Sequence, residues 1–215
     1  MKLTVFGATG GIGTQLIRQG LARGHEMTAV SRRPVELGCA VVVAGLDDAA
    51  ALAGAVAGRD AVLSALGLRA PEMKARRRRD PAARSTVQAD GARAQAAAMR
   101  ATGVRRIVSV DAAGRVADEG DGALTRAVVK PLLQRLLREG FEDLAEAERV
   151  LRASGADWTL IAPPRLTGGG HRPYRAVLDI NVRGARTLSR ADVADAMFRA
   201  LEEPSWVGRR VSVAY

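Results

Sequence analysis

A glycine-rich turn close to the N-terminus constrains the fold of this 215-residue chain more than any other feature. The apolar run Lys2–Phe6 is typical of a β-strand, and Gly7-Ala8-Thr9-Gly10-Gly11-Ile12-Gly13 follows it directly, with glycines in a GxxGxxG pattern. Residues Gly11–Arg23 then carry large apolar side chains at helical spacing. A strand, a turn of this kind and an amphipathic helix are the first half of a βαβ unit.

Each glycine of the pattern has its own physical reason. Gly7 permits a tight turn out of the strand, Gly10 lets the backbone approach a pyrophosphate, and Gly13 lets the helix pack closely on the strand. The N–H groups at the helix start then face the anion. We therefore expect a dinucleotide at Gly7, Thr9, Gly10, Gly11, Ile12 and Gly13; the alternative is a structural turn that has lost its cofactor.

The rest of the chain alternates short apolar runs with helix-length segments. Strands are predicted at Glu26–Ser31, Ala40–Ala44, Ala61–Ser64, Arg106–Val110, Trp158–Ala162 and Val211–Ala214. Helices are predicted at Asp47–Ala57, Arg84–Thr102, Thr125–Arg138, Glu142–Ala153 and Arg190–Glu203, with Gly140 separating the third from the fourth and Ser189 capping the last. This order predicts a three-layer α/β fold with a doubly wound parallel sheet of the Rossmann type. We expect one NAD(P)-binding domain over residues 1–215, with residues 163–188 as a substrate-side segment within it.

A second cofactor signal stands at the end of the strand Glu26–Ser31. Domains that prefer NAD place a carboxylate there to accept hydrogen bonds from the ribose 2′-hydroxyl. This chain has Ser31-Arg32-Arg33 instead, and two guanidinium groups can hold a 2′-phosphate bidentately, with the Ser31 hydroxyl assisting. The sequence thus predicts NADP as the cofactor; the alternative is two solvated arginines in an arginine-rich chain.

The net charge of +10 raises the question of nucleic acid, but the excess is local. Residues 69–106 contain eleven basic and three acidic side chains, including the run Arg76–Arg79. This segment is either a solvated loop and helix face or a basic lid over an anionic ligand, with Arg76–Arg79 as its mobile edge. No helix-turn-helix or zinc-finger spacing is present, and aromatic residues are only 3% of the chain, so we expect no nucleic-acid partner.

Other classes of protein are excluded by residue counts. The single cysteine, Cys39, excludes a disulfide framework, and two histidines without a cysteine cluster give no zinc site, so we expect no metal. No apolar run reaches the roughly 18 residues of a membrane span, and the N-terminus lacks the layout of a signal peptide. We expect a cytoplasmic protein that does not bind a membrane. No exposed apolar stripe stands out, which leaves the oligomeric state open.

Several segments together resemble the atypical short-chain dehydrogenases/reductases. They are Val5–Gly13, Asp60–Gly67, Leu151–Thr159, Ala162–Leu166 and Ser189–Ala194, spread over nearly the whole chain. Within that group the chain is most similar to the NAD(P)H-binding (NmrA-like) proteins close to flavin reductases and biliverdin-IXβ reductases. The resemblance implies the strand order 3-2-1-4-5-6-7.

The resemblance also implies cofactor contacts at the carboxyl ends of the strands. Leu46 and Asp47 would border the adenine, and Ala65, Leu66 and Gly67 would cover the ribose and pyrophosphate. The nicotinamide would be flanked by Val110 and Asp111 and by Pro163, Pro164, Arg165 and Leu166.

The usual catalytic pair of the resembling enzymes, Tyr-x-x-x-Lys, is missing. Neither Tyr174 nor Tyr215 precedes a lysine by four residues, and the two places fall near Gly140 and at Leu144. Four other candidates remain, each with a structural alternative. Asp111 is either an acid/base group or the cap of a turn, and Lys130 points either to the pocket or to solvent. His171 and Tyr174 are either substrate contacts or exposed loop residues.

These features favour an NADPH-dependent reductase that works by positioning, without a tyrosine proton relay. Its substrate would be a planar conjugated small molecule, aromatic or anionic: a flavin, quinone, tetrapyrrole or aromatic polyketide. One alternative is an isomerase, epimerase or cyclase that retains NADP and uses Asp111 as its base. The other is a non-catalytic regulator that senses NADP and binds a protein partner.

Overall fold

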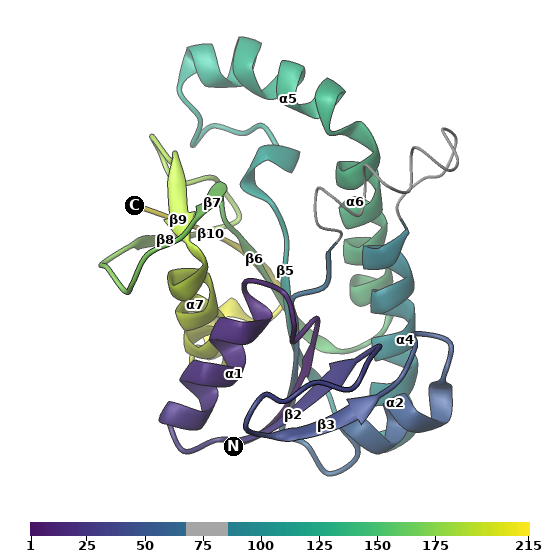
Figure 1. The fold of residues 1–215 in the computed structure, drawn as a ribbon. Coiled ribbons are helices and arrows are strands. Elements are labelled where there is room, and N and C mark those ends of the chain that lie inside the picture. The colour runs from purple at the N-terminus through teal and green to yellow at the C-terminus, as the bar shows by residue number, and fades with distance from the viewer. Residues whose placement is uncertain (68–85) are drawn as a thin grey trace.

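An eight-stranded sheet organises residues 1–67 and 86–215, the part of the chain that the computed structural model describes (Figure 1). Its strands are β1 (Lys2–Phe6), β2 (Glu26–Ser31), β3 (Ala40–Val43), β4 (Ala61–Ser64), β5 (Arg106–Val110), β6 (Asp157–Ala162), β8 (Arg175–Leu178) and β10 (Arg209–Ala214). They lie in the order β3-β2-β1-β4-β5-β6-β10-β8. The expected order of seven parallel strands is confirmed, with β10 as the seventh. The eighth strand, β8, is antiparallel to β10 and comes from the segment 163–188.

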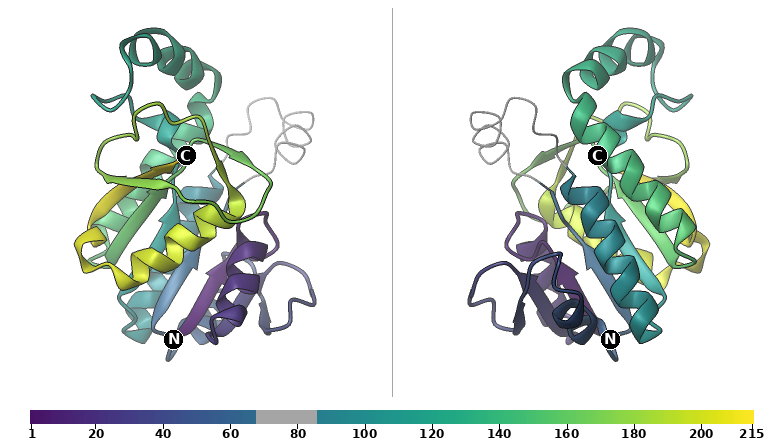
Figure 2. Two further views of the ribbon diagram at one scale, coloured as in Figure 1. Left: turned by 90° about the vertical axis from the view of Figure 1, so that its left-hand side faces the viewer. Right: turned by 90° about the vertical axis from the view of Figure 1, so that its right-hand side faces the viewer.

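Helices cover both faces of this sheet (Figure 2). The helices α1 (Gly13–Ala22) and α7 (Arg190–Glu202) pack together on one face. On the other face α4 (Val87–Thr102) packs between α2 (Ala49–Val56) and α6 (Arg138–Ala153). This is the doubly wound, three-layer arrangement that the sequence predicts.

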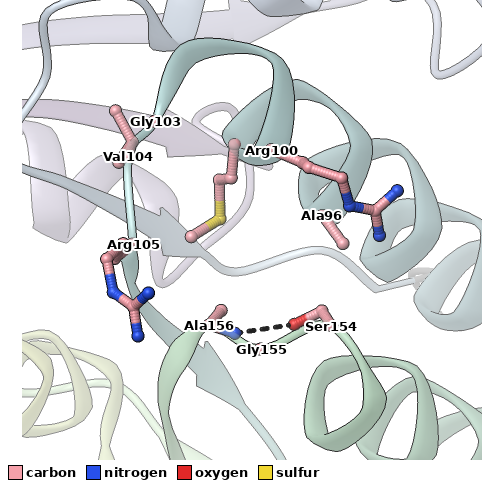
Figure 3. A pocket seen from close by; sticks show the side chains of 9 residues that line it. Ala96, Arg100, Gly103, Val104, Arg105, Ser154, Gly155 and Ala156 are labelled. Atoms are coloured by element: carbon pink, nitrogen blue, oxygen red, sulfur yellow. Dashed lines mark hydrogen bonds between the residues drawn. The ribbon is translucent and has the colours of Figure 1, made fainter.

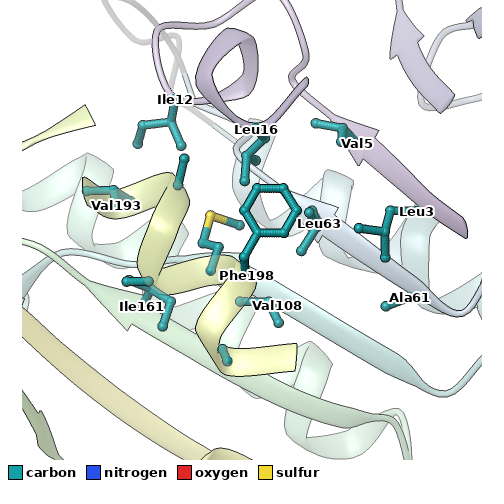
Figure 4. Close-up of a cluster of buried hydrophobic side chains, with 14 of the residues drawn as sticks. Leu3, Val5, Ile12, Leu16, Ala61, Leu63, Val108, Ile161, Val193 and Phe198 are labelled. Carbon is teal, nitrogen blue, oxygen red and sulfur yellow. The ribbon is translucent and has the colours of Figure 1, made fainter. Parts of the chain in front are cut away.

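The strands are apolar on both sides because each side faces a helical layer. Leu3 and Val5 of β1 and Leu63 of β4 belong to the core beneath α1 and α7, whereas Phe6 and Val62 belong to the opposite core. Phe198 of α7 reaches into the first core, among side chains from β1, β4 and β5 (Figure 4). Two cores of this kind hold the central strands rigidly. The loops that follow the strands therefore start from fixed points.

The segment after β6 builds a small second sheet. Its strands β7 (Arg165–Thr167) and β9 (Thr187–Ser189) pair in parallel and lead into α7. Short helical turns η1 (Ala113–Arg115), η2 (Thr125–Val129) and η3 (Pro204–Trp206) complete the described structure. None of its helices is long and apolar enough to cross a membrane. The predicted lid edge at Arg76–Arg79 lies outside the described residues.

One helix boundary differs from the prediction. Gly140 was expected to separate two helices, but it lies inside α6, and the break falls at Leu137, whose φ of −107° and ψ of 20° end α5 (Lys130–Leu136). A glycine inside a helix costs only about 1 kcal/mol. The packing of the surrounding turns outweighs that cost, so the prediction of a break at Gly140 is wrong.

Replacing Leu63 by alanine tests the core beneath α1 and α7. Leu63 is fully buried, so L63A should lower the free energy of unfolding by about 2–5 kcal/mol, measured by chemical denaturation. L136A is the matched control: Leu136 is 75% exposed, and the same change there should stay within about 0.5 kcal/mol. Equal effects at the two positions would contradict this assignment of the core.

Candidate functional site

The glycine-rich turn packs directly against the backbone that follows β4. Gly7 has φ +73°, in the left-handed region, and a Cβ placed on it would lie 2.5 Å from the carbonyl oxygen of Ala65. A Cβ on Gly13 would collide with the Gly7 carbonyl. Glycine is therefore required at both positions. The structure brings the turn and the segment Ala65–Leu66 together, two regions that the sequence analysis assigned to the same ligand.

The start of α1 is open for an anion. The Gly10 N–H donates to the Gly7 carbonyl oxygen at 2.9 Å, and Thr14 donates to Gly10 from both its N–H and its hydroxyl. The residue at the N-cap position of α1, Ile12, makes no side-chain capping hydrogen bond. The first N–H groups of a helix have no partner within the helix and favour negative charge. A helix start that follows glycines without side-chain bulk fits the pyrophosphate of a dinucleotide.

The end of β2 lies beside this turn. β1 and β2 are parallel neighbours, with Phe6 opposite Val30, so Ser31, Arg32 and Arg33 leave the sheet next to Gly7. The Ser31 hydroxyl is buried and accepts a weak hydrogen bond from the Arg33 N–H at 3.4 Å. Both arginine side chains are exposed. This placement suits a 2′-phosphate at the same edge of the sheet.

The predicted adenine border lies on the next strand. Leu46 and Asp47 follow β3, which pairs with β2, and they line one part of a groove of about 620 Å³ between α2 and α4.

The end of β4 is bound to α4 by two hydrogen bonds. Gln88 donates to the Leu66 carbonyl at 2.5 Å, and Gln95 donates to the Ser64 hydroxyl at 2.9 Å.

Asp143 is a residue that the sequence analysis missed. Its buried carboxylate, on α6, accepts the N–H groups of Gln88 and Ala89 at 3.1 and 2.9 Å and so caps the start of α4. The two partners lie about 55 positions away in the chain, so no local pattern could have shown this cap.

Asp111 is held by two arginines. It follows β5 and is 5% exposed. Arg115 binds both of its carboxylate oxygens, at 2.8 and 2.9 Å, and Arg210 of β10 donates to one of them at 2.8 Å. Arg115 also contacts Glu148 at 2.5 Å. A general base needs an oxygen that can take up a proton. Both oxygens of Asp111 are bound to guanidinium groups, so the geometry does not support the acid/base role.

Lys130 supports a loop, a role that the sequence analysis did not consider. Its ammonium group is buried, donates to the carbonyl oxygens of Ala113 and Val116 at 2.9 and 2.5 Å, and pairs with Asp121 at 2.7 Å. It points neither into an open pocket nor to solvent, so both expected placements are wrong.

The loop that Lys130 supports is also bound to the segment after β8. Asp118 accepts the backbone N–H of Asn181 at 3.0 Å and its side-chain amide at 2.6 Å. Gly120 lies so close to the Asn181 carbonyl that no side chain would fit. We call the paired segments 116–121 and 179–182 the loop clamp.

The places of the missing tyrosine and lysine contain no polar relay. Gly140 and Leu144 occupy them on α6, and the neighbouring Phe141 approaches Gly114 together with Leu133. This wall of the site is therefore apolar where the resembling enzymes carry their proton donor.

His171 and Tyr174 bind two different carboxylates of α7. His171 is largely exposed, and its Nδ1 lies 2.7 Å from Asp192 in the first turn of α7. Tyr174 donates to Asp195 at 2.8 Å, and burial, followed by this carboxylate, raises the pKa of Tyr174 far above its usual value. Asp195 also pairs with Arg23, at the end of α1 remote from the glycine-rich turn. Tyr174 is thus neither activated nor close to the turn.

Asp192 is the buried centre of the contacts around His171. Burial acts to raise the pKa of its carboxyl, but hydrogen bonds from Tyr215, Ser189, the Arg172 N–H and His171 outweigh it and hold the pKa below its usual value. Asp192 therefore stays charged and fixes the start of α7.

The other predicted nicotinamide neighbours lie together. Asp111 donates its N–H to Ile161, and Ala113 donates to Pro163 at 2.9 Å, so the ends of β5 and β6 are adjacent. Val110 and Pro164 are half-buried there. Arg165 and Leu166 continue into β7.

An apolar stripe is exposed on η2 and α5, contrary to the expectation that none stands out. Leu124, Val128, Leu132 and Leu136 recur every four residues and are 54–75% exposed. The opposite side of the helix, with Lys130, faces the body of the protein. Apolar residues occur all round this helix, so its periodicity does not show which side is buried.

A hollow of about 260 Å³ lies at the end of the sheet where the parallel strands begin (Figure 3). Its lining includes Arg100 and Arg105 before β5 and Ser154 before β6. Parallel strands begin at one edge and end at the other. This hollow is therefore remote from the glycine-rich turn.

Comparison with known proteins places the chain among nucleotide-binding proteins. A sequence model of the family described as NAD(P)H-binding matches residues 7–204. A Burkholderia pseudomallei structure, assigned as an exported protein, is 27% identical over the whole of both chains, with a TM-score of 0.74. A Streptococcus pneumoniae structure, assigned as an NADH-flavin reductase, is 23% identical over 100% of this chain and 99% of that one, with a TM-score of 0.78. A Veillonella parvula short-chain dehydrogenase/reductase in complex with NADP is 17% identical over 100% and 94%, with a TM-score of 0.76. The last two show the fold.

Replacing Asp111 by asparagine distinguishes a structural ion pair from a base. D111N leaves the buried Arg115 and Arg210 without their shared counter-charge, so the free energy of unfolding should fall by about 3–5 kcal/mol. D90N is the matched control: Asp90 pairs with Arg93 at the surface, and the loss there should be about 0–1 kcal/mol. Unchanged stability of D111N together with a roughly 100-fold fall in kcat would restore Asp111 as a base.

Proposed function

This chain belongs to the NAD(P)H-binding family, and we propose that it is an NADPH-dependent reductase that transfers a hydride to a planar conjugated small molecule. One observation carries the proposal: the chain keeps an intact dinucleotide turn, while Gly140, Phe141 and Leu144 stand where the resembling enzymes carry their proton relay. The substrate classes are a flavin, a quinone, a tetrapyrrole or an aromatic polyketide.

NADP, rather than NAD, is supported by the end of β2. A carboxylate at Ser31, Arg32 or Arg33 would repel a 2′-phosphate, and the chain has none there. The two arginines, with exposed side chains, follow β2 beside the glycine-rich turn, at the end of the sheet where the parallel strands terminate. Arginine binds phosphate in a bidentate manner and is always charged.

The residues around the site hold and shield the ligands. When bound, NADPH supplies the hydride. The turn at Gly7–Gly13 holds the dinucleotide, and the adjacent ends of β5 and β6, at Val110 and Pro163, form the wall beside its reactive end. Among the described residues neither acid candidate is available there, because Asp111 is bound to two arginines and Tyr174 is bound to Asp195. A conjugated acceptor spreads the incoming charge over its ring system and takes its proton from water, so positioning suffices.

A second candidate is an NADP-sensing regulator. The exposed stripe Leu124, Val128, Leu132 and Leu136 favours it, since extended apolar surface of this kind marks sites of protein contact. The isomerase alternative has less support, because its base, Asp111, has no free oxygen.

An acceptor panel tests the reductase. NADPH oxidation should be followed with FMN, FAD, menadione and biliverdin and, as controls, with small aliphatic aldehydes and ketones. We expect turnover with at least one conjugated acceptor and none with the aliphatic carbonyls. Tight NADPH binding without turnover of any acceptor would favour the regulator. Reduction of aliphatic ketones would contradict the proposed substrate class.

Exchanging both arginines after β2 tests the cofactor preference. The double variant R32S/R33S should raise the Kd for NADPH by about 10–100-fold, because hydrogen bonds to charged groups contribute about 1.5–3 kcal/mol. The Kd for NADH should stay within about twofold, since NADH lacks the 2′-phosphate. R149S is the control, because Arg149 is an exposed residue of α6 on the opposite face from α1. Equal losses for the two cofactors would show that these arginines do not distinguish them.

A further inference from the structure

We propose that Arg190 binds the pyrophosphate of the dinucleotide across the glycine-rich turn, an assignment that rests on the proposed function. Arg190 is the first residue of α7, and its side chain lies on Gly11. A Cβ built on Gly11 would be 2.6 Å from Cδ and 2.9 Å from Nε of Arg190. The guanidinium group is thus held above the turn by direct contact with its backbone.

This contact explains a glycine that the GxxGxxG pattern leaves unexplained. The pattern needs Gly7, Gly10 and Gly13, whereas Gly11 is an additional glycine. Gly11 does not have a positive φ, so its backbone conformation is open to other residues. Apart from its chain neighbours, the three atoms nearest to a Cβ there all belong to the Arg190 side chain. Gly11 therefore makes room for Arg190.

The charge of Arg190 has no counter-ion within the described residues. Its guanidinium group makes no hydrogen bond or ion pair there, although the side chain is half-buried. Asp192, two positions further on, forms no ion pair with it; that carboxylate accepts hydrogen bonds from Ser189, Tyr215, His171 and the Arg172 N–H instead. A partly desolvated cation without a partner is stabilised by an anionic ligand.

Two sources of positive potential meet at this point. The start of α1, where Ile12 makes no side-chain capping bond, follows Gly11 directly, and Arg190 approaches the same turn from α7, which packs on α1. Helix start and guanidinium both favour a phosphate group. A pyrophosphate, with negative charge on both phosphates, suits this pair of donors at one turn. The 2′-phosphate is assigned instead to the neighbouring Arg32 and Arg33.

Three probes separate the two phosphate positions. The variant R190M keeps the apolar stem and removes the charge. Its Kd for NADPH and for ADP should rise about tenfold or more, while its Kd for 2′-AMP, which lacks the 5′-phosphates, stays within about twofold. R32S/R33S should show the reverse: loss of 2′-AMP binding with ADP unchanged. R149M should change none of the three.

A second set of variants tests the pairing with Gly11. G11A should weaken ADP binding in the wild-type background by displacing Arg190, and it should have little further effect in R190A, which has no side chain for the new methyl group to meet. R190K keeps the charge without the planar fork and should fall between R190M and wild type. Thermal unfolding of every variant checks that the fold is retained.

The outcomes are distinct. If wild type binds neither NADPH, NADH nor ADP, the proposed function fails. If wild type binds NADPH and R190M binds it equally well, only the Arg190 assignment is overturned. Loss of 2′-AMP binding in R190M would also overturn it, since Arg190 would then serve the 2′-phosphate. Additive effects of G11A and R190A would contradict the proposed contact.

Discussion

The close approach of Gly7 to the backbone of Ala65 is the constraint on which the site depends. The two chain segments touch without room for a single side-chain carbon between them. This contact sets the end of β1 against the end of β4, at the middle of the sheet. The helix start at Gly13, the arginines after β2 and the side chain of Arg190 are all positioned relative to that point. The backbone contact between Gly7 and Ala65 therefore fixes where the side chains around the turn can lie.

The charged side chains Asp111 and Lys130 stabilise the fold, and each is bound by its own partners. Asp111 joins the end of β5 to Arg210 on β10, and Lys130 joins α5 to the loop it covers. In a buried network each charge needs its partner, because an isolated one would be costly to desolvate. On the proposed function, such a wall suits substrates that need a hydride and orientation but no proton from these side chains.

The fold and the close packing of the glycine-rich turn could be predicted from the sequence because their signals are local. Strand periodicity and the turn Gly7–Gly13 each lie within a few consecutive residues. The partners of Asp111 could not be predicted, since Arg210 is 99 positions away. The contact between Gly11 and Arg190 was missed for the same reason. The buried face of α5 was missed because that helix is apolar on several sides, so only tertiary packing chooses among them.

The loop clamp has a consequence for how such a protein acquires new substrates. Asp118 and Asn181 tie together two loops that are more than 60 positions apart in the chain. A substitution in either loop must preserve the contacts between the two loops, so the loop clamp tolerates little change. The glycine-rich stretch 168–170 and the outer face of α5 carry no such mutual fit in the described structure. On the proposed function, those two regions are therefore the first positions to vary in a library for altered substrate range, and the clamp is the part to leave unchanged.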